Sequence, residues 1–315
     1  MKSMKNIVLF GLACFMQLVH FDAQAQQDPK FNQYMFNPLG INPAYAGSRE
    51  AISGVALFRN QWIGIDGAPT TQSFAIHGPL MNKKMGLGFQ MSNDNIGARN
   101  TINAEFDYAY RFPLLKGKMS LGLGAGFNYF TFNWNKVTFK DAADVVPFYG
   151  QSQILTPDVD FGAFYNTRKL YIGIEFAHLL EPKANFSAAD SLLSLGLAYK
   201  QFRHMSLTFG RAFVLNKHLT LKPSILYKQA GLYQGVLDLN VSVLIDEKLW
   251  AGITARPNYG AAVILEYVIA EKYRIGYSFD YPFNALRYTN GSSHEIFLGI
   301  DLALRKSPSV SPRYF

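Results

Sequence analysis

The chain has 315 residues and a formal net charge of +8, but its 30 Lys and Arg form no block or stripe, which excludes a nucleic-acid partner. Hydrophobic residues make up 49% of it and charged residues only 17%, which excludes intrinsic disorder. The single cysteine excludes a disulfide scaffold and a cysteine-ligated metal site, and six histidines leave little for a histidine-rich one, so we predict no metal and no cofactor.

Residues 1–25 have the features of a secretory signal peptide. Two lysines precede an apolar run over residues 7–19, and the triplet Ala-Gln-Ala at 23–25 predicts cleavage after Ala25. A membrane-anchoring helix is the weaker alternative, because a span needs about 20 apolar residues. A lipoprotein signal ending at Cys14 is a second alternative, but Gly11 stands where such signals favour Leu. Cleavage would leave a mature chain without cysteine.

Residues 26–50 differ from the rest of the chain. They have no sustained period and are rich in aromatic residues and Asn-Pro pairs, which mark turns. We predict an ordered cap or plug segment, either periplasmic or lumenal, ahead of the first strand.

From residue 51 onward the dominant period is two, in segments of about 10 residues, which is typical of β-strands. For example, Glu105 and Asp107 fall on one face of their segment, and Phe106 and Tyr108 on the other. We predict fourteen strands, near 51–63, 70–80, 84–93, 100–113, 117–132, 158–166, 169–178, 205–214, 218–229, 233–245, 248–256, 259–269, 272–281 and 293–304.

Short turns alternate with longer loops between these segments. Three connections exceed 10 residues, at 133–157, 179–204 and 282–292, whereas others, such as 116–118 and 246–248, are short turns. Bacterial outer-membrane barrels have this alternation, with short periplasmic turns and long extracellular loops.

The predicted fold class is all-β: an antiparallel transmembrane outer-membrane β-barrel of about 14 strands over residues 51–304, with an N-terminal Asn/Pro/aromatic-rich cap segment. A soluble β-sandwich is the alternative, but fourteen strands of about 10 residues exceed the usual strand length and sheet size. A closed barrel also has no edge strand whose unpaired backbone groups would need to be covered. Segment 191–199 has strand character too. Counting it would make the strand number odd, so we place it in an extracellular loop and assign no role to 186–202.

Glycines follow the same period at 86 and 88 and at 122, 124 and 126. A phosphate-binding loop would need the spacing G-x-G-x-x-G and a helix after it, and neither is present. We interpret these glycines as small residues on the inward face of a strongly bent sheet.

The alternation predicts which charged residues face the lumen. Nine acids and four cations point inward, so the lumen is expected to be net acidic in a basic protein. Cross-strand ion pairing is one interpretation of this set, and a cation-selective pore is the other. The inward residues are Glu105, Asp107, Asp160, Glu175, Asp238, Glu266, Asp280, Glu295 and Asp301, with Arg111, Lys222, Lys228 and Arg274.

No enzyme motif is present: there is no G-x-S-x-G, and His294-Glu295 is not followed by a second His at zinc-helix spacing. His77 and Ser73 are the best available base and nucleophile pair for a hydrolase. They are four residues apart on one strand, a separation of about 13 Å by strand rise, which is too far for a direct proton transfer. We therefore predict no enzymatic activity and no catalytic residues.

The barrel is expected to close with 293–304 paired against 51–63. Residues 305–315 contain two prolines and cannot continue a central strand, so we predict a periplasmic C-terminal tail. An assembly signal at Phe315 is the alternative.

Several short motifs resemble the PorP/SprF family of type IX secretion system membrane proteins. They are Gln-Tyr-Met-Phe-Asn-Pro at 33–38, Asn-Pro-Ala-Tyr-Ala-Gly at 42–47, Arg-Asn-Gln-Trp at 59–62, Gly-Ala-Pro-Thr-Thr-Gln at 67–72 and His-Gly-Pro-Leu at 77–80. The match is strongest over 27–130 and rests on barrel patterning beyond.

The resemblance implies a β-barrel in the outer membrane of Gram-negative bacteria of the Bacteroidetes type. It implies a component of the type IX secretion and gliding machinery that assists export or surface attachment of cargo proteins. The implied partners are periplasmic ring or peptidoglycan-linked components, secreted cargo and outer-membrane lipid. The residues carried over as an interaction or plug-forming set are Asn42, Pro43, Tyr45, Arg59, Gln61 and Trp62. A passive, cation-selective outer-membrane channel is the alternative function.

Overall fold

The computed structural model describes residues 28–49, 51–80, 83–137, 150–186, 197–233, 235–289 and 291–303. The predicted signal peptide (1–25) and C-terminal tail (305–315) lie outside these ranges. The strands are β1 (Ala51–Asn60), β2 (Thr70–Pro79), β3 (Met85–Ile96), β4 (Arg99–Leu114), β5 (Gly117–Asn133), β6 (Gln151–Asn166), β7 (Leu170–Ala177), β8 (Lys183–Phe186), β9 (Leu197–Lys200), β10 (His204–Arg211), β11 (Phe213–Val214), β12 (Leu219–Ala230), β13 (Val236–Ile245), β14 (Leu249–Arg256), β15 (Gly260–Ile269), β16 (Tyr273–Pro282) and β17 (Ser293–Ala303).

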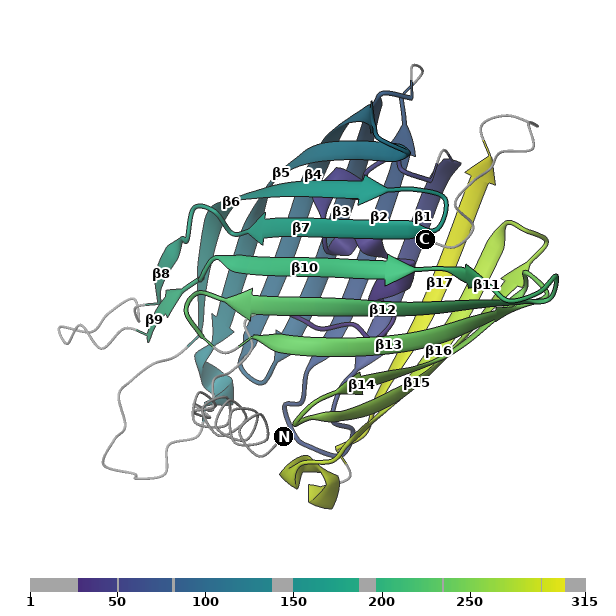
Figure 1. The fold of residues 1–315 in the computed structure, drawn as a ribbon. Coiled ribbons are helices and arrows are strands. Elements are labelled where there is room, and N and C mark those ends of the chain that lie inside the picture. Colours follow the sequence, from purple (N-terminus) through teal and green to yellow (C-terminus); the bar gives the residue numbers. More distant parts are fainter. Residues whose placement is uncertain are drawn as a thin grey trace, which may run out of the picture.

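The strands form a closed antiparallel barrel (Figure 1). β11 continues β10 after a break at Ala212, and both pair with β12. The first strand pairs with the last, from Ala51 opposite Ala303 to Asn60 opposite His294. With β10 and β11 counted as one strand, the barrel has fourteen strands. The predicted strand number and the predicted closure of the barrel are both confirmed.

The period-two pattern of the sequence becomes an inside and an outside of the barrel. In β4, Phe106 is 69% exposed on the outer surface, whereas Glu105 and Asp107 are buried in the lumen. The exposed outer surface continues as apolar residues on other strands, such as Ile253 and Val263. Such an apolar outside suits lipid, because the closed sheet satisfies its backbone hydrogen bonds internally. No helix in the described part of the chain is long and apolar enough to cross a membrane.

Two loop predictions need correction. β6 begins at Gln151 rather than near 158, because residues 151–157 continue the pairing with β5, down to Asn133 opposite Gln151. This β5–β6 hairpin makes the barrel wall taller on one side (Figure 1). Part of the loop placed at 179–204 is a small hairpin of β8 and β9, paired outside the barrel sheet. Residues 187–196 within it lie outside the described part.

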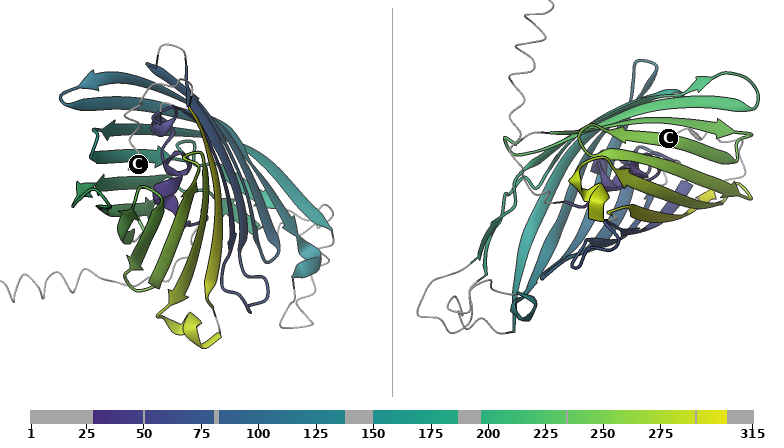
Figure 2. Two further views of the ribbon diagram at one scale, coloured as in Figure 1. Left: turned by 90° about the vertical axis from the view of Figure 1, so that its right-hand side faces the viewer. Right: turned by 90° about the horizontal axis from the view of Figure 1, so that it is seen from below.

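Residues 28–49, here called the plug segment, lie inside the barrel (Figure 2). They carry three single-turn 3₁₀ helices, η1 (Tyr34–Phe36), η2 (Pro38–Gly40) and η3 (Pro43–Tyr45). Further 3₁₀ turns, η4 (Trp134–Lys136) and η6 (Ala285–Thr289), lie in loops. Two of the buried apolar clusters form where the plug segment meets the wall, with Phe36 against Trp250 and Phe297, for example. A third cluster, around Phe130 and Trp134, lies at the long-loop end of β5 without a plug residue. Most of the buried apolar core in the described part of the chain is therefore the interface between plug and barrel.

Candidate functional site

The plug segment owes its shape to its Asn-Pro pairs. Pro38 and Pro43 each open a 3₁₀ turn, where a missing N–H costs nothing and a fixed φ suits the turn. The Asn42 side chain caps η3 by accepting the N–H of Ala44 at 2.9 Å. These local bonds let a short segment without a regular helix remain compact inside the lumen.

The middle of the plug segment is bonded directly to the barrel backbone. Asn42 Nδ2 donates to the carbonyl oxygens of Ala163 (3.1 Å) and Ile174 (2.9 Å), which belong to neighbouring strands β6 and β7. The approach is close because the wall carries glycine there: a Cβ at Gly122 would overlap the backbone of Ala44. The inward glycines thus have a reason beyond sheet curvature, since at Gly122 only a hydrogen atom fits beneath the plug.

The first turn of the plug segment is held by a buried carboxylate. Glu295 of β17 accepts the backbone N–H groups of Asn32 and Gln33, both at 2.9 Å. Arg59 of β1 lies 3.2 Å from the same carboxylate and 3.1 Å from Asp280, and all three charged side chains are almost fully buried. A buried charge is tolerated only when it is paired and hydrogen-bonded, and here the plug backbone supplies part of that bonding.

The C-terminal part of the plug segment is anchored near the short turns. The backbone N–H of Gly47 donates to His77 Nδ1 at 3.0 Å, and Arg111 donates to the Gly47 carbonyl. Arg49 makes two hydrogen bonds to Asp301, at 3.0 and 2.8 Å. His77, considered above for a hydrolase pair, therefore uses this ring nitrogen to hold the plug.

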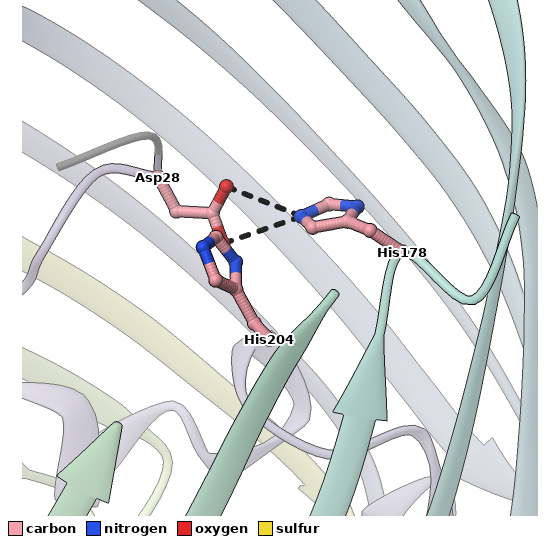
Figure 3. A group of neighbouring side chains, drawn as sticks. All are labelled: Asp28, His178 and His204. Carbon is pink, nitrogen blue, oxygen red and sulfur yellow. Dashed lines mark hydrogen bonds and ion pairs between the residues drawn. The ribbon is translucent and has the colours of Figure 1, made fainter. Parts of the chain in front are cut away.

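The N-terminal part of the plug segment is anchored at the opposite, long-loop end. Asp28 lies between His178, which follows β7, and His204, which begins β10 (Figure 3). Its oxygens are 3.2 Å from His178 Nε2, 2.6 Å from His204 Nδ1 and 3.0 Å from Lys228 Nζ. His178 Nδ1 lies 2.6 Å from Asp158. The plug segment thus spans the lumen from the long-loop end to the short-turn end.

The charges around Asp28 shift the pKa values of this group. Burial alone would raise the pKa of Asp28, but His204, Lys228 and His178 together hold it well below its usual range. Burial opposes charge on His178, yet Asp28 and Asp158 raise its pKa well above the usual value. The contact between plug and wall is therefore ionic at neutral pH.

A hollow remains beside this part of the plug. An empty volume of about 580 Å³, which includes solvent-open space, lies between the plug segment and strands β1, β12 and β13. Lys30, Tyr34 and Asp238 line it. Lys30 Nζ is buried without a hydrogen-bond partner among the described residues. Burial, and secondly Arg256, lower the pKa of Lys30 from 10.5 to about 7.

The charged side chains that face the lumen are paired to different extents on the two sides of the barrel. Eight of the nine acids predicted to face inward are buried, and the ninth, Asp301, faces inward toward Arg49 of the plug. On one side of the barrel the acids are paired, with Asp238 bonded to Arg256 at 2.6 and 2.7 Å, for instance. On the side formed by β4, β6 and β7, no Lys or Arg nitrogen of the described residues lies within 4 Å of four buried carboxylates. These are Glu105, Asp107, Asp160 and Glu175. Ion pairing thus accounts for part of the acidic set and leaves an acidic patch, defined by these four residues.

The structure brings together some of the residues carried over from the resemblance. Asn42, Pro43 and Tyr45 are buried in the plug segment, and Arg59 supports it through Glu295. Gln61 and Trp62 stand apart, in the loop after β1. Their hydrogen bonds go to the barrel, from the Gln61 N–H to Pro69, the Trp62 N–H to Ser293 and the Trp62 indole to Tyr259 at 3.0 Å.

Sequence reasoning missed the residues at the two ends of the plug segment. Asp28, His178 and His204 had no motif to mark them, because each stands alone in its part of the chain. Glu295 was placed in the lumen by the alternation, but nothing in the sequence indicated that it binds the plug backbone. Arg49 was likewise missed.

One family model matches nearly the whole chain: that of the type IX secretion system membrane protein PorP/SprF, over residues 23–300. No curated protein matches the chain in sequence. Among solved structures, a Pseudomonas aeruginosa FadL homologue is 12% identical with a TM-score of 0.47, covering 88% of this chain and 95% of its own. The Ralstonia pickettii toluene transporter TbuX is 10% identical with a TM-score of 0.49, covering 84% and 92%. These likenesses concern the fold alone.

Proposed function

Because the chain belongs to the PorP/SprF family of type IX secretion system membrane proteins, we propose that it assists export or surface attachment of cargo proteins as an outer-membrane component of the secretion and gliding machinery. The family match over residues 23–300 carries this proposal. The plug segment supports it, since a lumen occupied along its length by bonded chain suits a scaffold better than a conduit. The proposed role needs no catalytic residue.

The proposed partners divide between the two ends of the barrel. Cargo would be met at the long-loop end, if those loops are extracellular, and periplasmic ring or peptidoglycan-linked components at the short-turn end. The two ends are joined through the plug segment, because Asp28 contacts His178 at one end and Arg49 contacts Asp301 at the other. A partner that displaced one of these anchoring contacts would therefore weaken the binding of the whole plug segment to the barrel.

The alternative is a passive cation-selective channel, and the acidic patch is the observation in its favour. Four buried carboxylates without close Lys or Arg would attract cations into an open lumen. The plug segment opposes this function, because it lies across the lumen next to the wall strands that carry the patch.

Two measurements on the purified full-length barrel separate these functions. Copurification with secretion components from chemically cross-linked outer membranes is expected for the scaffold, with an unrelated outer-membrane barrel from the same cells as the control. In planar bilayers we expect no steady current from the wild-type protein. A steady, cation-selective current together with an absence of secretion partners would reject the scaffold in favour of the channel.

A further inference from the structure

The long-loop end of the lumen brings together three side chains of the types that bind transition metals. Asp28 comes from the plug segment, His178 directly follows β7, and His204 begins the adjacent strand β10 (Figure 3). We propose that these three residues form a binding site for a divalent transition metal ion of the Zn²⁺ class, which fastens the plug segment to the barrel. The inference rests on this geometry and is independent of the secretory role.

The spacing of the ligand atoms suits a single ion. One atom from each of the three residues lies within 4.8 Å of the others, and Asp28 is 3.2 Å from His178 Nε2 and 2.6 Å from His204 Nδ1. Zn²⁺ binds imidazole nitrogen and carboxylate oxygen at about 2.0–2.2 Å, so two of its ligands lie at most about 4 Å apart. Small side-chain adjustments would bring the three ligand atoms to the separations that a single ion requires. Two imidazoles and one carboxylate are a donor set for Zn²⁺ and its neighbours, not for Mg²⁺ or Ca²⁺.

His204 supplies an independent observation. Its side chain is only 3% exposed, yet Nδ1 makes no hydrogen bond with any described residue. The Asp28 oxygen 2.6 Å from Nδ1 is the charged group paired with it. Buried polar atoms are nearly always satisfied, and a metal ion held between this nitrogen, the Asp28 carboxylate and the second imidazole would satisfy all three.

His178 is oriented as metal-binding histidines are. Its Nδ1 lies 2.6 Å from Asp158, and this contact turns Nε2 toward Asp28. A carboxylate behind the distal ring nitrogen fixes the ring and its tautomer and raises the basicity of the metal-binding nitrogen. Asp158 is therefore a positioning residue, not a ligand, in this proposal.

The charge of the surroundings also favours a cation. Asp158, Asp160 and Glu175 are buried nearby, and the backbone N–H of His178 donates to Asp160. Lys228 is the competing cation, because its Nζ lies 3.0 Å from Asp28 Oδ2. A divalent ion would have to share Asp28 with Lys228 or displace it. Removing the Lys228 charge should therefore strengthen metal binding.

The test is Zn²⁺ titration of the full-length, chelator-stripped barrel in detergent, followed by isothermal calorimetry. We expect one Zn²⁺ per barrel in the wild type and loss of that site in His178→Gln and in His204→Gln. Asp158→Asn should raise Kd about 10–100-fold, the range for a second carboxylate behind a histidine ligand, and Lys228→Met should lower Kd. The control is His218→Gln, which removes an exposed histidine paired with Asp246 in a short turn.

Folding of each variant is checked by heat-modifiable gel migration. If a histidine variant does not fold, Co²⁺ added to the wild-type protein replaces it as the test, since Co²⁺ held by nitrogen and oxygen ligands has a visible absorption band. We expect one equivalent of Co²⁺ to produce that band and Zn²⁺ to remove it. The proposal is overturned by a stripped wild-type barrel that binds no Zn²⁺ and gives no such band. It is also overturned by folded His178→Gln and His204→Gln variants that bind Zn²⁺ as well as His218→Gln does.

Discussion

Glu295→Gln is the sharpest test of how the plug segment is held. The carboxylate accepts two backbone N–H groups of the plug, one at each oxygen, and lies 3.2 Å from Arg59. Glutamine keeps the size of the side chain but has one acceptor oxygen and one NH₂ group. In either orientation of the amide, a plug N–H faces another donor. Arg59 keeps Asp280 as a partner at 3.1 Å, so the barrel wall should stay intact.

The expected cost follows from these contacts. A hydrogen bond to a charged group contributes about 1.5–3 kcal/mol, and a buried donor left without a partner costs about 1–3 kcal/mol. The substitution leaves one plug donor without its acceptor, so docking of the plug should weaken by about 1–3 kcal/mol. At about 1.4 kcal/mol per factor of ten, the undocked population should rise by roughly 5- to 150-fold.

Limited proteolysis measures this population, because cleavage of the plug segment requires its local opening. We expect the cleavage rate within residues 28–49 to rise by a factor of that order, with the barrel resistant throughout. The matched control is His294→Gln, the neighbouring residue of β17, which faces outward and contacts Tyr277 at 2.6 Å. Equal cleavage rates in the two variants would refute our account of Glu295.

Three further predictions concern the lipid face, the orientation and a buried lysine. Val241→Arg, at a 52% exposed position in the middle of β13, should destabilise the barrel in lipid by about 2–4 kcal/mol in urea titrations. Leu237→Arg, about 13 Å along the strand, should cost about 0–1 kcal/mol, and equal costs would show that Val241 is not at the bilayer centre. An impermeant thiol reagent on whole cells should label Lys183→Cys but not Asn216→Cys, and the opposite result would invert the orientation. Burial lowers the pKa of Lys30 to about 7 from 10.5, so the docked plug loses stability as pH falls from 10.5 to 7 and no more below. Lys30→Met should therefore slow proteolysis of the plug at pH 7 and have little effect near pH 11, whereas a slower rate at both would refute the assignment.

The barrel could be predicted because its pattern is local. Successive side chains of a strand point to opposite sides of the sheet. The order of residues in this segment therefore predicts by itself that Glu105 faces the lumen and Phe106 faces the lipid. Turn lengths then indicated the connectivity, and the count of fourteen strands followed. The prediction was wrong where pairing overrides local signals. Residues 151–157 contain Pro157 and were assigned to a loop, but the long partner strand β5 holds them in β6.

Only the tertiary structure shows which barrel residues hold the plug segment in place. Glu295 meets Gln33 across 262 positions and Asp28 meets His178 across 150, so no spacing in the sequence could indicate either contact. The sequence determined that residues 26–50 are unlike a strand and that certain acids point into the lumen. The height and angle of each strand around the closed ring decide the environment of each lumenal acid. They determine which acids are neutralised by the wall, which bind the plug and which remain as the acidic patch. Those positions follow from barrel closure, a property of all fourteen strands together and of no single segment.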